Sequence, residues 1–478
     1  MQSQGLKSNF VYQSLRVIST ACIGLIMMPY VNRTLGVQYL GKVEYANTLI
    51  SYFLMFSALG IPLYGIREVA KLKGDKAQRS KLTFELLIIL FFTSVLSYTI
   101  LWATLFYWEG LQDYKSLIIL LSSSILLTNM GAEWYFQGME NQRFITIRFL
   151  IIRCITLVLL FLLVRSSADY YWYALLLVLN SCGANLVNFV YLYRSLDRSQ
   201  LKTIGYRDLT KHWRPIFTIF VATISINIYL QLDILLLGTL VGDHYVGLYV
   251  AANRLLRFVI TFITTIGVVL LPRLSSLYQN DKQNYEIYLK KGFDSILLLS
   301  VPSTIFIFIF AHEIIYYMAG ADFQEAVITL KILSPLCIVV GMAYFFGYLF
   351  LYVQGKEKIY THSVLVSAVV SIIANSFMIK NYYHNGAAIV AVMAEVLAVV
   401  QMLIAIKLQR NTRRLIDVNV YKLLMANAVI FIGGYFGIQH MPFYILLILM
   451  LLAYSLLLWI LKENTTRWIV YTIKMKIK

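Results

Sequence analysis

The sequence predicts an all-α polytopic membrane protein of about 14 transmembrane helices, with two parallel six-helix lobes around a central cavity plus two C-terminal helices. Three observations lead to this fold class. The 478-residue chain is 60% hydrophobic and only 13% charged. Its apolar runs recur near the length of about 20 residues that a helix needs to cross a bilayer. A motif near the start of the chain returns 206 residues later, which indicates a duplication.

The apolar runs define fourteen expected spans. The first run is too long for the apolar core of a signal peptide, so we expect it to be retained as a membrane helix. Because the number is even, both ends of the chain are expected on the same side of the membrane. The expected spans are 9–31, 43–64, 82–108, 116–137, 144–165, 171–193, 215–240, 248–271, 293–316, 325–353, 359–380, 386–407, 422–439 and 443–461.

The distribution of Lys and Arg sets the expected orientation. Basic residues gather in the loops 65–81, 194–214, 273–291 and 407–422 and in the tail 462–478. The loops on the other side hold only Arg33, Lys42, Lys115, Arg165 and Lys380. Since Lys and Arg are retained on the cytoplasmic side, we expect both termini in the cytoplasm. The net charge of +18 is then a topology signal, and it gives no reason to expect a nucleic-acid partner.

The sequence offers little support for an enzyme or a metal protein. The expected outward loops are too short to form a catalytic domain, and no phosphate-binding GxxxxGK[ST] loop is present. The segment HEIIY has Tyr316 where a zinc-binding helix needs a second His, so we expect no metal site. The four cysteines fall in apolar runs without zinc or disulfide spacing, and we interpret them as small core residues: Cys22, Cys154, Cys182 and Cys337.

The repeated motif registers two halves of the chain. GVQYLGKVEYANTL, residues 36–49, and GDHYVGLYVAANRL, residues 242–255, share Gly, Tyr, Gly, Ala, Asn and Leu without a gap. The same offset aligns Arg67 with Arg273. Because six spans separate the copies, the halves run parallel. One interpretation is that the motif serves a tight turn and close helix packing; the other is that both copies flank the mouth of the cavity.

The repeat and the basic central segment predict the domain boundaries. We expect an N-terminal lobe at 1–194, a cytoplasmic linker at 195–214, a C-terminal lobe at 215–410, and spans 13 and 14 with a cytoplasmic tail at 411–478. Parallel halves of this kind enclose a central cavity and rock about it.

Three segments resemble the oligosaccharide flippases of the multidrug/oligosaccharidyl-lipid/polysaccharide exporter superfamily. They are SLRVISTACIGLIMMPYVNRTLGVQYLGKVEYANTLISYF, EWYFQGMENQRFITIR and QLDILLLGTLVGDHYVGLYVAANRL. The resemblance implies translocation of undecaprenyl-pyrophosphate-linked oligosaccharide units, for O-antigen, capsule or a related glycan, across the bacterial inner membrane. It also implies membrane lipid, a glycan polymerase and chain-length proteins as partners, and no cofactor.

A carrier of such a substrate needs cations for the pyrophosphate and aromatic groups for the sugars. Basic residues inside spans are expensive and usually face the interior. Arg254 and Arg257 share a helical face, and Arg16 lies on a polar stripe of the first span. Each arginine could instead pair with a carboxylate or extend to an interface, as we expect for Arg148. The predicted substrate-binding residues are Arg16, Arg254, Arg257, Arg153, Lys331, Tyr12 and Tyr229.

Intramembrane acids suggest ion coupling. Asp233, Asn375 and Glu395 have oxygen atoms in the outer half of the C-terminal lobe, where they could hold Na⁺ or accept H⁺. An acid on the seventh span and an amide on the eleventh also resemble the cation site of the lipid II flippases. Glu133 is a fourth candidate. The alternative is that these residues form hydrogen bonds between helices.

The expected mechanism is alternating access from the cytoplasmic to the outer leaflet. A multidrug cation antiporter of the same superfamily is an alternative, although such a protein would favour an acidic pocket. A membrane-bound glycan polymerase is a more distant alternative, because it would carry a long outer loop or a paired-acid metal motif, and the sequence has neither.

Overall fold

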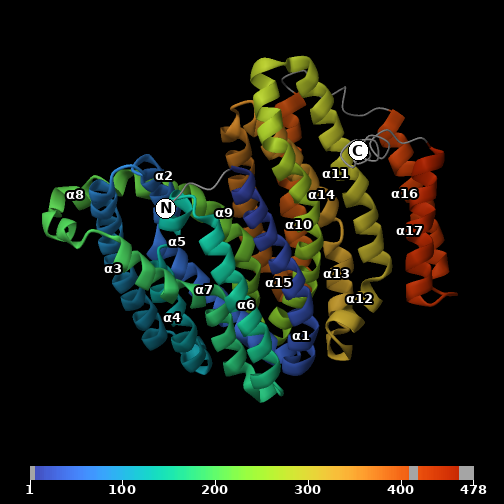
Figure 1. Ribbon diagram of the computed structural model, residues 1–478. Coiled ribbons are helices and arrows are strands. Elements are labelled where there is room, and N and C mark those ends of the chain that lie inside the picture. Colours follow the sequence, from blue (N-terminus) through green and yellow to red (C-terminus); the bar gives the residue numbers. More distant parts are fainter. Residues whose placement is uncertain (1–5, 408–417, 462–478) are drawn as a thin grey trace. The chain divides into compact units, whose positions relative to one another are not determined.

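The computed structural model describes residues 6–407 and 418–461, except for the side chains of 6–11, 13, 14, 17, 18, 21 and 222–230. The described residues form helices joined by short turns, without strands (Figure 1). The chain packs as two units, Met1–Gly247 and Leu248–Lys478. The predicted boundaries of the lobes and linker stay a prediction.

In the first unit, α1 is the central helix. It packs against α3, α4, α6 and α9, and α4 packs against α7. Gly36, with a φ of 69°, turns α1 inside its length, so α1 supplies the first expected span and most of the second. The helices are α1 (Leu6–Ala58), α2 (Ile61–Lys71), α3 (Lys76–Tyr107), α4 (Lys115–Gly131), α5 (Glu133–Gly138), α6 (Gln142–Leu163), α7 (Tyr170–Ser195), α8 (Tyr206–Thr210) and α9 (Trp213–Leu240), with short 3₁₀ turns η1 (Glu109–Tyr114), η2 (Ser167–Asp169) and η3 (Arg198–Thr203).

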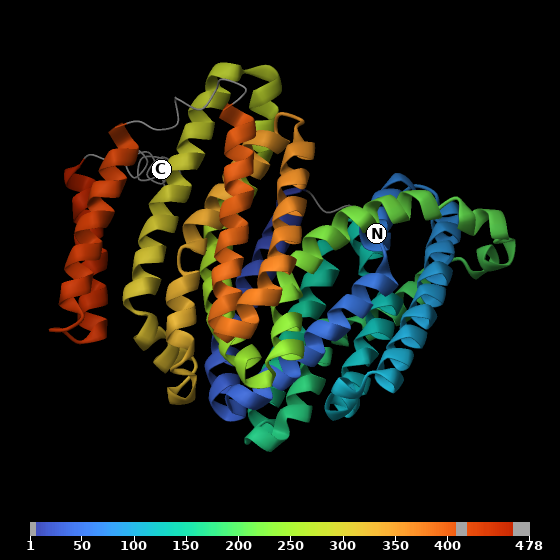
Figure 2. The same cartoon turned by 180° about the vertical axis from the view of Figure 1, so that it is seen from behind.

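In the second unit, α11 packs against α14 and α16, and α13 and α14 pack against α15. Tyr383, with a φ of 52°, divides α15 into two arms that supply two expected spans (Figure 2). The helices are α10 (Asp243–Asn280), which begins in the first unit, α11 (Lys282–Ile309), α12 (Ala311–Met318), α13 (Ala326–Leu333), α14 (Leu336–Tyr344), α15 (Glu357–Lys407), α16 (Val418–Gly437) and α17 (Phe443–Ile460), with a 3₁₀ turn η4 (Ala321–Phe323) and a π-helical segment η5 (Phe345–Tyr352).

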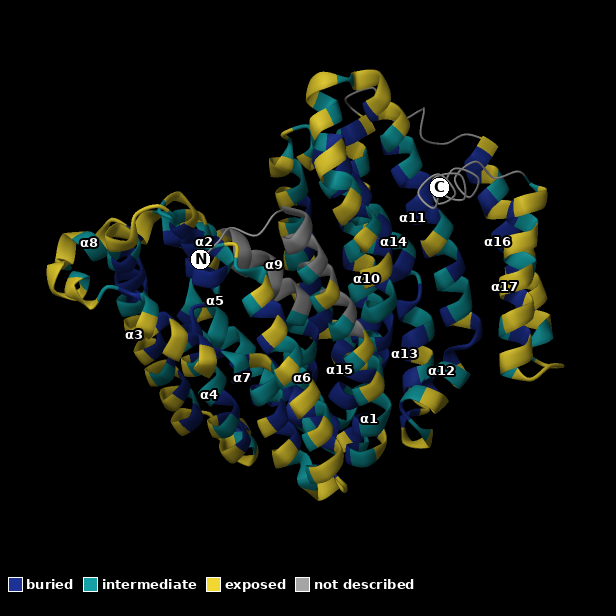
Figure 3. Ribbon diagram, viewed as in Figure 1, coloured by how far each residue is buried: buried dark blue, intermediate teal, exposed yellow. Residues whose placement is uncertain are grey.

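The prediction of an all-α polytopic membrane protein is confirmed. The described residues contain 11 helical segments long and apolar enough to cross a membrane. Two of these segments, Cys22–Lys71 and Glu357–Lys407, contain a turn of the backbone, at Gly36 and Tyr383, and Gln231–Leu240 of α9 is a shorter apolar helix. Large apolar side chains such as Phe92 on α3 and Leu452 on α17 are exposed, as lipid contact requires. Figure 3 shows many exposed residues along both helices.

Two segments expected as cytoplasmic loops, 65–81 and 273–291, are mostly helical instead. α10 extends to Asn280 and α11 begins at Lys282, so little of 273–291 is loop. Asp281 caps α11 by accepting a hydrogen bond from the N–H of Asn284 at 3.1 Å. Asp75 caps α3 in the same way through Gln78 at 3.0 Å. A capping carboxylate satisfies a free amide at the start of a helix, which lets the helix extend beyond its apolar part.

The repeated motif packs against itself, reciprocally, within the first unit. A Cβ on Gly41 would lie 1.8 Å from the backbone oxygen of Asp243, and one on Gly247 would lie 2.1 Å from that of Val37. These contacts are equivalent by the offset of the repeat. The leading glycines, Gly36 and Gly242, both have positive φ. The geometry supports the turn-and-packing interpretation of the motif, because the first glycine of each copy turns the chain and the second permits backbone contact.

Candidate functional site

The candidate site lies in the first unit, where α1, α5 and α6 meet. Nη1 of Arg16, on α1, lies 2.8 Å from Oε1 of Glu133, at the start of α5. Nε2 of Gln137, one turn later on α5, donates to the same oxygen at 3.0 Å. The Arg16 and Glu133 side chains are only 28% and 31% exposed. The contacts join two segments that are 117 residues apart in the sequence.

Phe149 of α6 brings a second arginine to the site. The guanidinium of Arg16 lies 4.5 Å from the centre of the Phe149 ring, and that of Arg153 lies 4.7 Å from it. A cation over an aromatic face is attracted by the ring quadrupole. The ring therefore holds two like charges near each other at a half-buried position. Of the predicted substrate residues, Arg16 and Arg153 are thus brought together.

Arg148 corrects one prediction. It does not extend to an interface, because it is only 6% exposed. Its guanidinium lies over the rings of Phe144, at 4.5 Å, and Phe136, at 5.3 Å, and donates weakly to the carbonyl of Ala184 at 3.5 Å. Aromatic and carbonyl partners inside the unit replace the contact with water that an exposed position would provide.

The cluster of Arg16, Arg148, Arg153 and Glu133 carries more positive than negative charge and more hydrogen-bond donors than acceptors. Glu133 pairs with Arg16 and acts electrostatically on Arg148, whereas Arg153 feels the positive charge of Arg16. The Nε atoms of Arg148 and Arg153 are buried and have no hydrogen-bond partner among the described residues. Buried donors without acceptors are costly. The cluster can therefore bind an anion, and guanidinium groups match phosphate oxygens in pairs.

Of the two predicted tyrosines, only Tyr12 is described. Its carbonyl oxygen accepts a hydrogen bond from the Thr146 hydroxyl at 3.3 Å, which ties α1 to α6 beside the cluster. The Tyr12 side chain is half-buried. The side chain of Tyr229, on α9, lies outside the described residues.

The remaining predicted cations belong to the second unit. Arg254 and Arg257 lie on α10 and are half-buried. The hydroxyl of Thr261, one turn further along α10, donates to the Arg257 carbonyl at 2.8 Å, so this hydroxyl is already engaged within the helix. Lys331, on α13, lies 5.7 Å from the ring centre of Phe308. That Arg254 and Arg257 face Arg16 across a shared cavity stays a prediction.

The predicted ion-coupling residues fall in both units. Asp233 of α9 is buried and acts electrostatically on Tyr52 of α1. In the second unit, Asn375 is fully buried on α15, and its amide donates to the Ser371 hydroxyl at 3.2 Å. Glu395, on the other arm of α15, acts on Tyr360. Asn375 thus makes a hydrogen bond within its own helix, and a common ion site for these residues stays a prediction.

Sequence reasoning did not identify Gln137 and Phe149, and it dismissed Arg148. A signal for Gln137 was present, because Glu133 and Gln137 are four residues apart and share a helical face. No local pattern indicates Phe149, because an aromatic residue in an apolar run is indistinguishable from its neighbours until the helices pack.

The sequence matches two known families. Residues 6–278 match the family described as polysaccharide biosynthesis protein, and residues 218–377 match the family described as MatE. The chain is also similar to a protein of Escherichia coli (strain K12) named "Putative O-antigen transporter". The two are 22% identical over 425 residues, which cover 86% of this chain and 98% of the relative.

Two solved structures share the fold. One is titled "Lipid II flippase MurJ, inward closed conformation", with a TM-score of 0.76, 14% identity, and coverage of 96% of this chain and 100% of that chain. The other is an inward-facing multidrug resistance transporter of the MATE family, with a TM-score of 0.58, 13% identity, and coverage of 82% and 99%. The similarity to these structures extends over most of the chain.

Proposed function

Since the chain belongs to the polysaccharide biosynthesis protein family, we propose that it is a flippase that moves lipid-linked oligosaccharides across the membrane by alternating access. The similar protein of Escherichia coli is named for O-antigen transport, and the similar structure of higher TM-score is that of a lipid II flippase. The substrate class is an oligosaccharide joined through pyrophosphate to undecaprenol. The protein is a carrier and not an enzyme.

The arginine cluster is the observation that carries this proposal. A pyrophosphate diester has about two negative charges at neutral pH, because each phosphate keeps one ionised oxygen. Arg16, Arg148 and Arg153 together carry three positive charges against the one negative charge of Glu133, which leaves an excess of the same size. Arg16 and Arg153 would bind the pyrophosphate, the half-buried position would strengthen the attraction, and Tyr12 would contact the first sugars.

The transport step follows from differential binding. The cavity takes the head group from the cytoplasmic leaflet, the lobes rock, and the head group emerges on the outer side while the polyprenyl tail stays in lipid. Na⁺ or H⁺ at Asp233, Asn375, Glu395 or Glu133 would drive the cycle by binding one state more tightly than the other. Arg254, Arg257 and Lys331 would supply cations from the other lobe, and Tyr229 would contact the sugars.

The cellular setting is part of the proposal. We place the protein in the bacterial inner membrane with both termini in the cytoplasm, because of the distribution of Lys and Arg. A glycan polymerase and chain-length proteins would use the product on the outer side.

The decisive test is flipping in proteoliposomes loaded with a lipid-linked oligosaccharide. We expect Arg16→Gln and Arg153→Gln each to lower the rate at least tenfold, because one lost charge-assisted hydrogen bond is worth about 1.5–3 kcal/mol. The matched control is Arg143→Gln, at an exposed position at the start of the same α6. Wild-type rates for both variants, at equal protein incorporation, would contradict the proposal.

A multidrug antiporter is the second candidate, favoured by the match of residues 218–377 to the MatE family and by the MATE-like structure. Expression in a strain that lacks both its O-antigen flippase and its drug exporters separates the two functions. We expect restored surface glycan with unchanged drug susceptibility; drug resistance without glycan would favour the antiporter.

A further inference from the structure

The linker between α7 and α9 is held on one face of the membrane. α7 ends at Ser195, at the end of a segment long and apolar enough to cross a membrane, and α9, a helix of 28 residues, begins at Trp213. The intervening residues form two short helical segments, η3 and α8, and Figure 1 shows α8 at the edge of the first unit. The linker must therefore lie beside the lipid headgroups, on the side that the Lys and Arg distribution predicts to be cytoplasmic.

The first turns of α3 fix the linker at two places. The N–H of Asp197 donates to the hydroxyl of Ser80 at 3.0 Å. Further on, Nζ of Lys81 lies 3.0 Å from Oδ2 of Asp208, which also accepts the N–H of Gly205 at 3.0 Å. The linker is thus connected to a membrane helix before and after the turn at Gly205.

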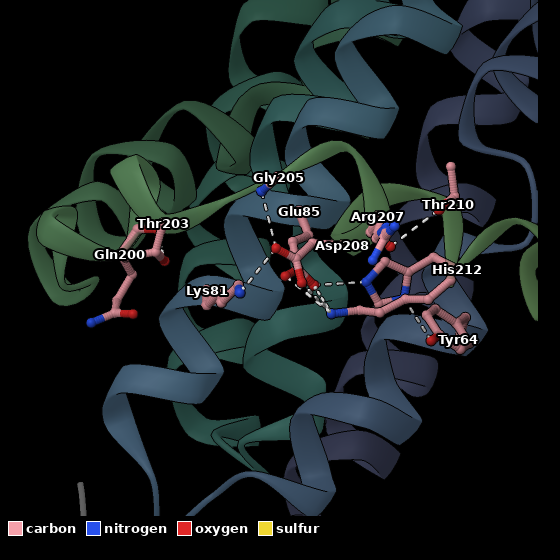
Figure 4. A network of polar contacts seen from close by, with 11 residues as sticks. Tyr64, Lys81, Glu85, Gln200, Thr203, Gly205, Arg207, Asp208, Thr210 and His212 are labelled. Carbon is pink, nitrogen blue, oxygen red and sulfur yellow. Dashed lines mark hydrogen bonds and ion pairs between the residues drawn. The ribbon is translucent and has the colours of Figure 1, made fainter.

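A buried network of polar contacts fixes the end of the linker that leads into α9 (Figure 4). Nε2 of His212 lies 2.8 Å from Oε2 of Glu85, and Nδ1 lies 2.7 Å from the hydroxyl of Tyr64. The Glu85 and His212 side chains are 1% and 3% exposed. Nζ of Lys211 lies 3.0 Å from Oε2 of Glu85. A linker connected to α2 and α3 by buried polar contacts keeps a defined surface.

These contacts use both carboxylates of the linker. Hydrogen bonds from the N–H of Gly205, and then the contact with Lys81, lower the pKa of Asp208 to about 2. Hydrogen bonds from Ser199 lower the pKa of Asp197. Both groups are ionised and engaged at neutral pH, so they do not neutralise the basic side chains that the linker exposes.

Four exposed basic residues remain on the linker and the helix that follows it. Within the described part of the chain, none of them forms an ion pair with a carboxylate: Arg198, Lys202, Arg207 and Arg214. The guanidinium of Arg198 lies 4.1 Å from the ring centre of Tyr193, at the end of α7. It is therefore held close to the membrane without losing its charge.

Large apolar side chains are exposed between these cations. Leu201, Tyr206 and Trp213 are 48%, 81% and 46% exposed, in the region of α8 that Figure 3 shows as mostly exposed. Tyr and Trp are enriched where a protein crosses the membrane interface, because the ring enters the acyl boundary while the polar atom stays at the headgroups. Alternating cationic and amphipathic groups are suited to an anionic lipid surface.

We propose that this surface, defined as Arg198, Lys202, Arg207 and Arg214 with Leu201, Tyr206 and Trp213, binds the anionic phospholipid headgroups of the cytoplasmic leaflet. The basic groups contact lipid phosphates and the apolar groups enter the interface. Because the buried network joins the linker to α2 and α3, bound lipid stabilises the first unit. This proposal does not depend on which substrate the protein carries.

The test compares two triple variants in neutral detergent micelles with increasing phosphatidylglycerol. Lys202→Gln/Arg207→Gln/Arg214→Gln removes charge from the linker surface. Lys282→Gln/Lys358→Gln/Lys407→Gln removes the same charge from exposed positions elsewhere. The readout is the phosphatidylglycerol fraction that gives half of the maximal rise in melting temperature. Melting without anionic lipid establishes that each variant is folded.

We expect the linker variant to need at least tenfold more phosphatidylglycerol than the wild type, since each basic residue near a membrane contributes appreciable attraction. The control variant should behave as the wild type, and 0.5 M NaCl should reduce the wild-type response. Equal responses from the two variants would overturn the proposal. So would a loss that appears with undecaprenyl pyrophosphate but not with phosphatidylglycerol, because the surface would then bind the substrate.

Discussion

Glu133 is the residue on which the charge balance of the candidate site depends. Its carboxylate accepts from both Arg16 and Gln137, and it is close enough to act on Arg148. An anionic ligand that binds Arg16 must compete with it. Glu133 therefore both stabilises the empty cluster and limits its affinity for phosphate.

Glu133→Gln separates these two effects. Without added anion, we expect a lower melting temperature than the wild type, because the guanidinium groups of Arg16 and Arg148 lose their countercharge. With inorganic pyrophosphate, we expect a larger rise than in the wild type, because the competing carboxylate is gone. Scanning fluorimetry with and without pyrophosphate measures both.

The control is Glu140→Gln, seven residues after Glu133 in the chain. It removes a half-exposed carboxylate that lies 2.7 Å from Nζ of Lys73. It should leave the response to pyrophosphate unchanged, since exposed ion pairs contribute little. A response of Glu133→Gln no greater than that of the wild type would mean that Glu133 does not compete with phosphate.

The lowered pKa of Asp208 predicts that the stability of the folded protein depends on pH. Its pKa is lowered from 3.8 to about 2, so its contribution is complete above about pH 4 and is lost as the pH falls towards 2. Asp208→Asn should therefore melt below the wild type at pH 7, and the difference should shrink between pH 4 and pH 2. Melting curves at several pH values measure it, with Asp322→Asn, at an exposed position, as the control.

At the scale of elements, the two copies of the motif contact each other through glycines. Gly41 lies in α1 and Gly247 in α10, and each faces the backbone of the other copy. The repeat is therefore visible in three dimensions as a reciprocal contact. A substitution in one copy should have the same consequence as the equivalent substitution in the other.

Gly41→Ala and Gly247→Ala test this equivalence. A Cβ at either position would lie far inside contact distance of a carbonyl oxygen, so each change should destabilise the protein by about 1–3 kcal/mol. Gly24→Ala, in the same α1 but with open space around it, should be neutral or slightly stabilising. Denaturant unfolding in detergent gives the comparison, and a difference of several kcal/mol between the two motif variants would contradict it.

At the scale of the whole molecule, the orientation in the membrane can be tested by labelling. In a chain with its four cysteines replaced by Ala, Thr203→Cys should react with an impermeant maleimide only in inverted vesicles. Asn381→Cys, at the expected outward turn of α15, should react only in intact spheroplasts. The opposite pattern would reverse the topology and place the arginine cluster on the outer side.

The sequence by itself determined the fold class, an all-α polytopic membrane protein, whereas the count of fourteen spans and the parallel arrangement of the halves stay predictions. Hydropathy and motif spacing are local properties that survive into the structure, because a helix in lipid must satisfy its own backbone hydrogen bonds. It also identified Arg16, Arg153 and Glu133 as residues of interest, because charges inside apolar spans are costly.

Only the tertiary structure decided which of these residues meet. Glu133, predicted as an ion-coupling residue, pairs with Arg16 from 117 positions away, and Phe149 joins Arg16 to Arg153. Arg148 is enclosed by Phe136 and Phe144 instead of reaching the interface. Such contacts depend on how α1, α5 and α6 cross, and a helical wheel describes only one helix. The physical reason is that pairing is set by packing between segments, whereas crossing the membrane is set within each segment.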